Sequence, residues 1–196
     1  MPPSGQSAMP RIVAAGFVTG TLPDMATELD DFLICMALRT NPDVQTPAAG
    51  WTDLGSASAD PSLLSMSICG RICDGSTYAD PYALNVTHGF VQIRGGGFDI
   101  SLPSSYATIT PHVTADNTIE WAASRLDARL TVQIACARLS QTDRGVLVAS
   151  AATFYPEEFN GDYLDTRIGF FEGPTPGSSK TPAPDSDTIT AVLSFT

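Results

Sequence analysis

The chain has 196 residues, a length that suits one all-β domain or at most two small ones. Its formal net charge is -11 and its only lysine is Lys180, so the clustered basic residues that nucleic-acid phosphates require are absent. It has no run of about 18 apolar residues, and no basic segment followed by an apolar stretch at its N-terminus. We therefore expect no nucleic-acid role, no transmembrane helix and no secretory signal.

The N-terminal ten residues contain three of the prolines, together with Ser and Gly. This composition predicts a flexible N-terminal arm over residues 1–10, followed by one β-sandwich domain over residues 11–196. We expect the arm to contact a partner, and the residues assigned to that contact are Pro2, Pro3, Pro10 and Arg11.

The stretch from Leu29 to Trp51 is the one around which the fold is organised. Phe32, Ile34 and Met36 would face one way on an extended strand, and the residues between them are also apolar, which indicates a central strand covered on both sides. Gly50 then predicts a chain reversal, and Trp51 can cover the end of a core.

Two-residue alternation predicts most of the other strands. In chain order the expected strands are 11–19, 63–73 with one face in water, 82–86, 90–94, 98–102, 106–114, 130–136, 146–154 and 189–195. Residues 121–128 are the best short helix candidate, and 156–187 is expected to be loop-rich. No internal repeat is visible. The pattern predicts an all-β fold, a single antiparallel β-sandwich that is jelly-roll-like and has long loops.

The four cysteines are expected to be free thiols rather than disulfides. On one strand Cys69 and Cys73 would have Cα atoms about 13 Å apart, beyond the roughly 7 Å that a disulfide tolerates. Because no paired CxxC or histidine spacing accompanies the cysteines, we expect no zinc site.

The remaining motifs favour structural interpretations over chemical ones. Gly95–Gly97 lacks the Lys-Ser/Thr and helix of a phosphate loop, so a turn is expected. The acidic stretch 157–165 could offer calcium ligands, but it lacks the EF-hand spacing, so a solvated loop is expected. His88 and His112 suggest no triad. We predict no catalytic residue, no cofactor and no metal, and hence no enzyme.

Several short stretches resemble small β-rich structural domains of tailed-bacteriophage virion proteins, found in tail, fibre and capsid-surface components. They are the acidic-ended strand Asp30-Asp31-Phe32-Leu33-Ile34 with Arg39 beyond it, the corner Pro47-Ala48-Ala49-Gly50-Trp51-Thr52, the strand end Arg94-Gly95, the stretch Asp116-Asn117-Thr118-Ile119 running into Trp121-Ala122-Ala123, and the terminal alternating strand. The family usually has a glycine before the acid at the start of the first of these strands. Here Leu29 and Asp30 occupy that place.

The resemblance implies a structural role on the virion exterior, after assembly in the bacterial host cytoplasm. The expected function is a capsid decoration or cement protein that binds other virion proteins, the major capsid or tail proteins, and that forms a homo-oligomer. The alternative is a tail or fibre receptor-binding adhesin, or a carbohydrate-binding module with a host glycan as its ligand. Trp51 or Tyr163 would then contact the sugar.

Overall fold

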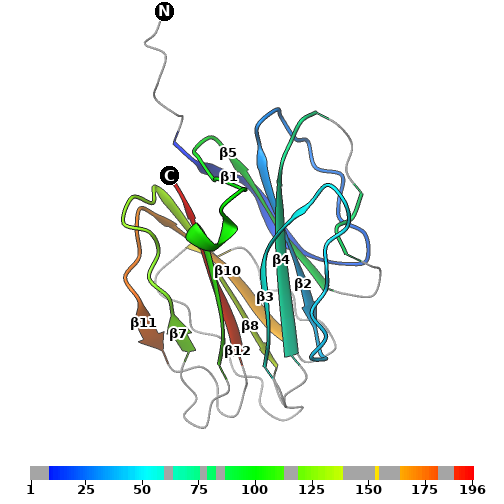
Figure 1. The fold of residues 1–196 in the computed structure, drawn as a ribbon, viewed down its shortest axis with the longest axis vertical. Coiled ribbons are helices and arrows are strands. Elements are labelled where there is room, and N and C mark those ends of the chain that lie inside the picture. The colour runs from blue at the N-terminus through cyan, green and yellow to red at the C-terminus, as the bar shows by residue number, and fades with distance from the viewer. Residues whose placement is uncertain are drawn as a thin grey trace, which may run out of the picture.

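Two antiparallel sheets, one from each half of the chain, form the fold in the computed structural model (Figure 1). The structure describes residues 9–59, 64–75, 79–82, 87–112, 119–138, 153–154, 164–180 and 188–196. Sheet A has the strand order β1-β5-β2-β4-β3 and sheet B the order β6-β12-β8-β10-β9, while β7 and β11 form a separate pair. The predicted all-β antiparallel sandwich is confirmed.

The strand bounds are as follows. Sheet A contains β1 (Arg11–Thr19), β2 (Phe32–Arg39), β3 (Thr52–Ala59), β4 (Leu64–Ile72) and β5 (Thr87–Arg94). Sheet B contains β6 (Ala107–His112), β8 (Leu130–Arg138), β9 (Thr153–Phe154), β10 (Leu164–Glu172) and β12 (Thr188–Phe195). The separate pair is β7 (Ile119–Trp121) with β11 (Ser178–Lys180), and a short 3-10 helix, η1 (Pro103–Ser105), precedes β6.

The two sheets repeat one topology. If the strands of each sheet are lettered a to e in chain order, both sheets have the spatial order a-e-b-d-c. Each sheet therefore comes from one half of the chain, whereas a jelly roll interleaves strands from both halves. In each half, three of the connections pass over one strand to reach the next position in the sheet.

The repeat extends to the strand register. Phe32 of β2 pairs with the last residue of β4, and Leu130 of β8 pairs with the last residue of β10. The next residue in each half then donates the same backbone hydrogen bond, from Cys73 N to Asp31 O at 2.7 Å and from Gly173 N to Arg129 O at 2.8 Å. The matched inner-face residues of β2 and β8 are apolar in both halves, whereas outer-face Leu33 and Cys35 correspond to Thr131 and Gln133.

The core lies between the inner faces of the two sheets. Phe32, Ile34 and Met36 of β2 are buried there with residues of β8 and β12. The alternate residues of β2, Leu33, Cys35 and Ala37, are buried on the outer face of sheet A. The third of five positions in the sheet belongs to β2, so the expected central strand covered on both faces is confirmed.

The prediction that the 63–73 strand has one face in water is wrong. Ser65 and Ser67 are both 1% exposed, because the 40–51 connection crosses over them. The hydroxyl of Ser65 donates to Asp43 O at 3.0 Å, and that of Ser67 accepts from Gln45 N at 2.7 Å. Their polar side chains are thus paired with backbone groups of the covering segment, as burial requires.

The expected helix at 121–128 is absent. Residue 121 ends β7, and the backbone of Ser124 bonds across to Thr175, with Ser124 N to Thr175 O at 3.0 Å and Thr175 N to Ser124 Oγ at 2.7 Å. These groups are therefore paired with the chain segment before β11 instead of with a helical turn. Tertiary pairing overrides the weak helical propensity of so short a segment.

Two further predictions are also wrong. Residues 98–102 form a turn, because the Asp99 carboxylate accepts from both the backbone N (3.0 Å) and the hydroxyl (2.6 Å) of Ser101. The stretch expected to be loop-rich contains β10, a nine-residue strand with Ile168 in the core. Three predicted segments lie wholly or mostly outside the described residues: the expected strands at 82–86 and 146–154, and the acidic residues 157–162.

Both edge strands of sheet A carry a β-bulge. The register shifts between Ile12 and Ala14 in β1, and between Asp53 and Gly55 in β3. Bulges on edge strands hinder pairing with the sheet of another molecule. Pro111 lies on β6, an edge strand of sheet B. Because one side of an edge strand has no neighbouring strand, a missing N–H on that side costs no ladder hydrogen bond.

In the described part of the chain no helix has the length and apolar character to span a bilayer.

A methyl group at Gly70 has no room. A Cβ there would lie 2.7 Å from Phe32 Cζ and 3.0 Å from Leu54 Cδ1, both of them core side chains. We therefore expect Gly70→Ala to lower the free energy of unfolding by about 1–3 kcal/mol, as overpacking does. Urea denaturation followed by tryptophan fluorescence measures the effect. Gly16→Ala, which meets only the ring of the partly exposed Phe90 at 3.2 Å, is the control and should cost clearly less; equal losses would contradict the packing argument.

Candidate functional site

One end of the sandwich gathers the features that could serve a function. At this end β1, β2, β6 and β8 begin and β4, β5, β10 and β12 end, and the Gly95–Gly97 turn crosses it on the way from sheet A to sheet B. Figure 1 shows it as the end that carries the C-terminus and η1. We call it the glycine end. Gly95 and Gly96 have φ of 78° and 75°, which confirms the expected turn.

A buried carboxylate fixes the chain at the glycine end. The side chain of Asp31 accepts from Arg94 Nε at 2.8 Å, Arg94 Nη2 at 2.9 Å and Gln92 Nε2 at 2.7 Å, and also from the backbone N of Glu28 at 2.8 Å. The Arg94 guanidinium is the largest cause that lowers the pKa of this carboxyl to about 2. A carboxylate that is ionised and accepts four hydrogen bonds in this way holds the 20–31 connection in place and is a weak proton acceptor near neutral pH.

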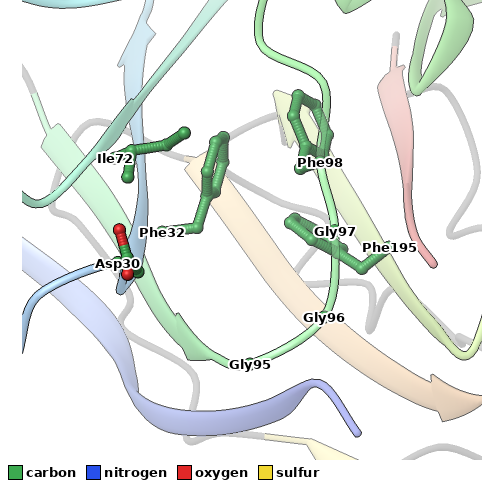
Figure 2. Close-up of a pocket in the computed structure, with 8 residues that line it drawn as sticks. All are labelled: Asp30, Phe32, Ile72, Gly95, Gly96, Gly97, Phe98 and Phe195. Atoms are coloured by element: carbon green, nitrogen blue, oxygen red, sulfur yellow. The ribbon is translucent and has the colours of Figure 1, made fainter. Parts of the chain in front are cut away.

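A pocket of about 230 Å³ opens beside this network. Its apolar wall consists of Phe32, Phe98 and Phe195, whose ring centroids lie 4.5 to 5.5 Å apart. Figure 2 shows the glycine turn running along one side of the pocket, with Asp30 and Ile72 on the other. The main-chain N of Gly97 donates to Thr196 O and Thr196 N donates to Gly97 O, so the terminal residue closes the turn against β12.

Asp30 is the one residue of the described part, other than glycine, with a positive φ, at 66°. This left-handed conformation is the one that glycine adopts without strain, and aspartate is one of the few other residues that visit it. The aspartate therefore holds an exposed carboxylate at the pocket wall in spite of a backbone cost.

Exposed apolar side chains surround the pocket. Among the described residues, seven large hydrophobic side chains are strongly exposed, and five of them lie at the glycine end: Met9 (62%), Leu29 (69%), Ile72 (44%), Leu102 (55%) and Leu126 (94%). Val13 is on the adjoining edge strand β1, and only Val44 lies elsewhere. Single exposed apolar residues are ordinary on any surface, but here five of the seven lie at the same end of the sandwich, and Ile72 lines the pocket itself.

Burial sets the protonation behaviour of the polar groups on the outer face of sheet A. Burial raises the pKa of the Cys35 and Cys73 thiols and of the Tyr82 hydroxyl, and it lowers the pKa of His88, whose Nδ1 lies 2.6 Å from Gly20 O. A nucleophilic thiol needs the opposite shift. All four cysteines are free thiols, as expected. Cys35 of β2 lies directly opposite Cys69 of β4 in the strand ladder, without a disulfide between them. In the described residues no three His, Cys, Asp or Glu side chains could hold a metal.

The residues singled out in the sequence are dispersed. Pro2 and Pro3 lie outside the described residues. Pro10 is buried and its ring adjoins Gly96, so the last residue of the predicted arm packs against the sandwich. Arg11 is exposed and pairs with Arg94 in the ladder of β1 and β5.

Trp51 lies with the outer-face residues of sheet A instead of the main core, and its indole N–H donates to Ala79 O at 3.0 Å. Only Pro10, Arg11 and Phe32 thus come together at the glycine end. Phe98, Phe195 and the exposed apolar residues were not among the predicted site residues, although an aromatic directly after three glycines was a usable signal.

Comparison of the chain with protein-family models, with curated proteins and with solved structures gives no match in any of the three.

Proposed function

We propose that this protein is a structural component of a bacteriophage virion exterior, a capsid decoration or cement protein that binds other capsid subunits. The observation that carries the proposal is the concentration of exposed apolar side chains at the glycine end. Such a surface is costly in water unless a partner covers it. The resemblance of the short sequence stretches to phage virion domains supplies the kind of partner.

The charge and the edges support the same proposal. A net charge of -11 keeps free copies apart in solution, which suits a protein that adds to a particle after the shell has formed. The bulged edges of sheet A disfavour docking by strand addition, so a partner would bind at the end of the sandwich. The carbohydrate-binding alternative loses one of its candidates, because Trp51 is 8% exposed and cannot present a ring face to a sugar.

The test is the protein's location. We expect it to co-purify with intact particles through a density gradient, at a fixed copy number per particle measured by quantitative mass spectrometry. The internal control is the major capsid protein in the same fractions. Finding the protein only in the cytosol of infected cells, with none in purified particles, would overturn the proposal.

A further inference from the structure

We propose that the pocket at the glycine end is a socket for one large apolar side chain carried on a basic segment of the partner protein. This inference rests on the proposed function for the identity of the partner, but the chemistry of the segment follows from the pocket itself. The argument has three steps, which concern the size of the pocket, its wall and its charge.

The size of the pocket suits one side chain. Its volume of about 230 Å³ lies below the range of roughly 300–1,000 Å³ that is typical of small-molecule sites. Apolar anchors that enter small pockets near the centre of an interface supply much of the binding energy of protein complexes. A Phe, Leu or Met side chain fits within this volume, where it would contact Ile72, the exposed apolar residue of the lining, and the small exposed parts of Phe32 and Phe98.

The surroundings of the pocket suit a protein segment. Exposed Leu29 and Ile72 flank the pocket, and Ile72 is one of its lining residues, so apolar contact would continue beyond the anchor. The wall is built on strand ends and on a turn tied to Thr196 by two backbone hydrogen bonds. The socket is therefore formed before any partner arrives, which lowers the ordering cost of binding.

The carboxylates next to the pocket favour a cationic segment, with exposed Arg11 as the opposing charge at the same end. The exposed Asp30 lines the pocket, and the exposed Asp99 follows Phe98. The arginines next to lining residues already have carboxylate partners: Arg94 bonds Asp31 and Glu28, and Arg71 bonds Asp74 at 3.3 Å. A second copy of this chain, with its net charge of -11 and one lysine, is a poor fit.

The first experiment uses the purified full chain and synthetic peptides. The probe is the acetylated and amidated peptide Lys-Arg-Gly-Phe-Gly-Arg-Lys, labelled for fluorescence polarisation, with the same peptide carrying Ala for Phe, and a Glu-for-Lys/Arg version, as comparisons. We expect the Phe peptide to bind at least about tenfold more tightly than either. Its affinity should fall as salt rises, because the carboxylates are exposed.

Two variants locate the binding. Ile72→Trp fills the mouth of the pocket from an exposed position and should weaken the Phe peptide by about tenfold or more. Asp30→Asn keeps a residue that tolerates positive φ but removes the charge, so it should weaken binding by about threefold and reduce the salt dependence. Val44→Trp, an equivalent change at an exposed site away from the glycine end, should leave binding unchanged.

Several results would overturn the socket. These are equal binding of the Phe and Ala peptides, equal binding of the acidic peptide, or full binding by Ile72→Trp. Concentration-dependent self-association that Ile72→Trp abolishes would identify a second copy as the occupant instead. A rebinding assay on particles stripped of the protein separates the two proposals. If the wild type and Ile72→Trp both rebind, the socket fails and the virion role stands. If the wild type does not rebind, the virion role fails and the peptide result decides the socket alone.

Discussion

Phe195→Ala is expected to lower the free energy of unfolding by about 3–5 kcal/mol, the range for deleting a buried phenylalanine ring. Phe195 is 1% exposed and is the last residue of β12, which lies between β6 and β8 in sheet B. Its ring packs against Phe98 at 5.0 Å and Phe32 at 5.5 Å, so it joins both sheets and the turn between them. Removing it would leave a cavity where these three segments meet.

The measurement is equilibrium urea unfolding followed by far-ultraviolet circular dichroism. Phe195→Leu retains most of the apolar volume and should lose less than half as much stability. Leu102→Ala is the exposed control at the same end of the molecule, expected to change stability by no more than about 0.5 kcal/mol. A Phe195→Ala variant as stable as Leu102→Ala would mean that the last strand is not part of the core.

Asp31→Asn is expected to cost about 3 kcal/mol, the lower part of the range for removing one partner of a buried ion pair. The Asp31 side chain is fully buried, and it accepts from two donors of Arg94 and one of Gln92. An asparagine amide would bring its own donor toward these groups. The cost stays near the low end because Arg94 is 24% exposed and keeps its contact with Glu28 at 2.6 Å.

The same residue predicts the acid sensitivity of the protein. Folding lowers the pKa of Asp31 from its usual 3.8 to about 2, chiefly through the Arg94 hydrogen bonds, so the folded state binds the proton less tightly than the unfolded state. Its contribution is therefore complete above about pH 4 and is lost as the pH falls through about 2. The shift amounts to about 2 kcal/mol. The stability gap between wild type and Asp31→Asn should narrow by about this amount from pH 5 to pH 2.

The neighbouring carboxylate is the control. Asp30 is exposed, and asparagine tolerates its left-handed backbone, so Asp30→Asn should change stability by no more than about 0.5 kcal/mol at any pH. If Asp30→Asn and Asp31→Asn were equally destabilising, or if the gap for Asp31→Asn did not vary with pH, the assignment of the ion pair as the source of the stability would be wrong.

Periodicity was enough to predict the central strand, because every side chain of β2 from Phe32 to Leu38 is apolar and both faces had to be covered. It failed at β4, where Ser65 and Ser67 follow the pattern of a face in water. Their burial depends on the 40–51 connection, and no local signal reveals a segment that crosses from elsewhere in the chain. It also failed at β10, where Asp165, Arg167 and Gly169 interrupt the apolar alternation and pairing with β8 decides the structure.

The candidate site was less predictable than the fold. Phe32 and Phe195 are more than 160 residues apart, and only the packing of the two sheets brings their rings to one pocket. Leu29 and Leu126 look like ordinary apolar residues until the structure places both at the same end. The glycine turn could be predicted as a turn from three successive glycines, whereas its role as the bridge between two sheets depends on the order of all the strands.

The recurrence of one strand order in both halves has a consequence for how the molecule comes apart. Each half contributes one apolar sheet face to the main core, and that face is excluded from water only while the other half packs against it, as at the interface of a dimer whose two subunits share one polypeptide. We therefore expect the two halves to unfold together, so that a destabilising substitution in either half lowers the midpoint of one shared transition. The Gly95–Gly97 connection holds the two halves at a high effective concentration. Cleaving the chain there would make their association bimolecular, so the stability of the fold would then depend on protein concentration.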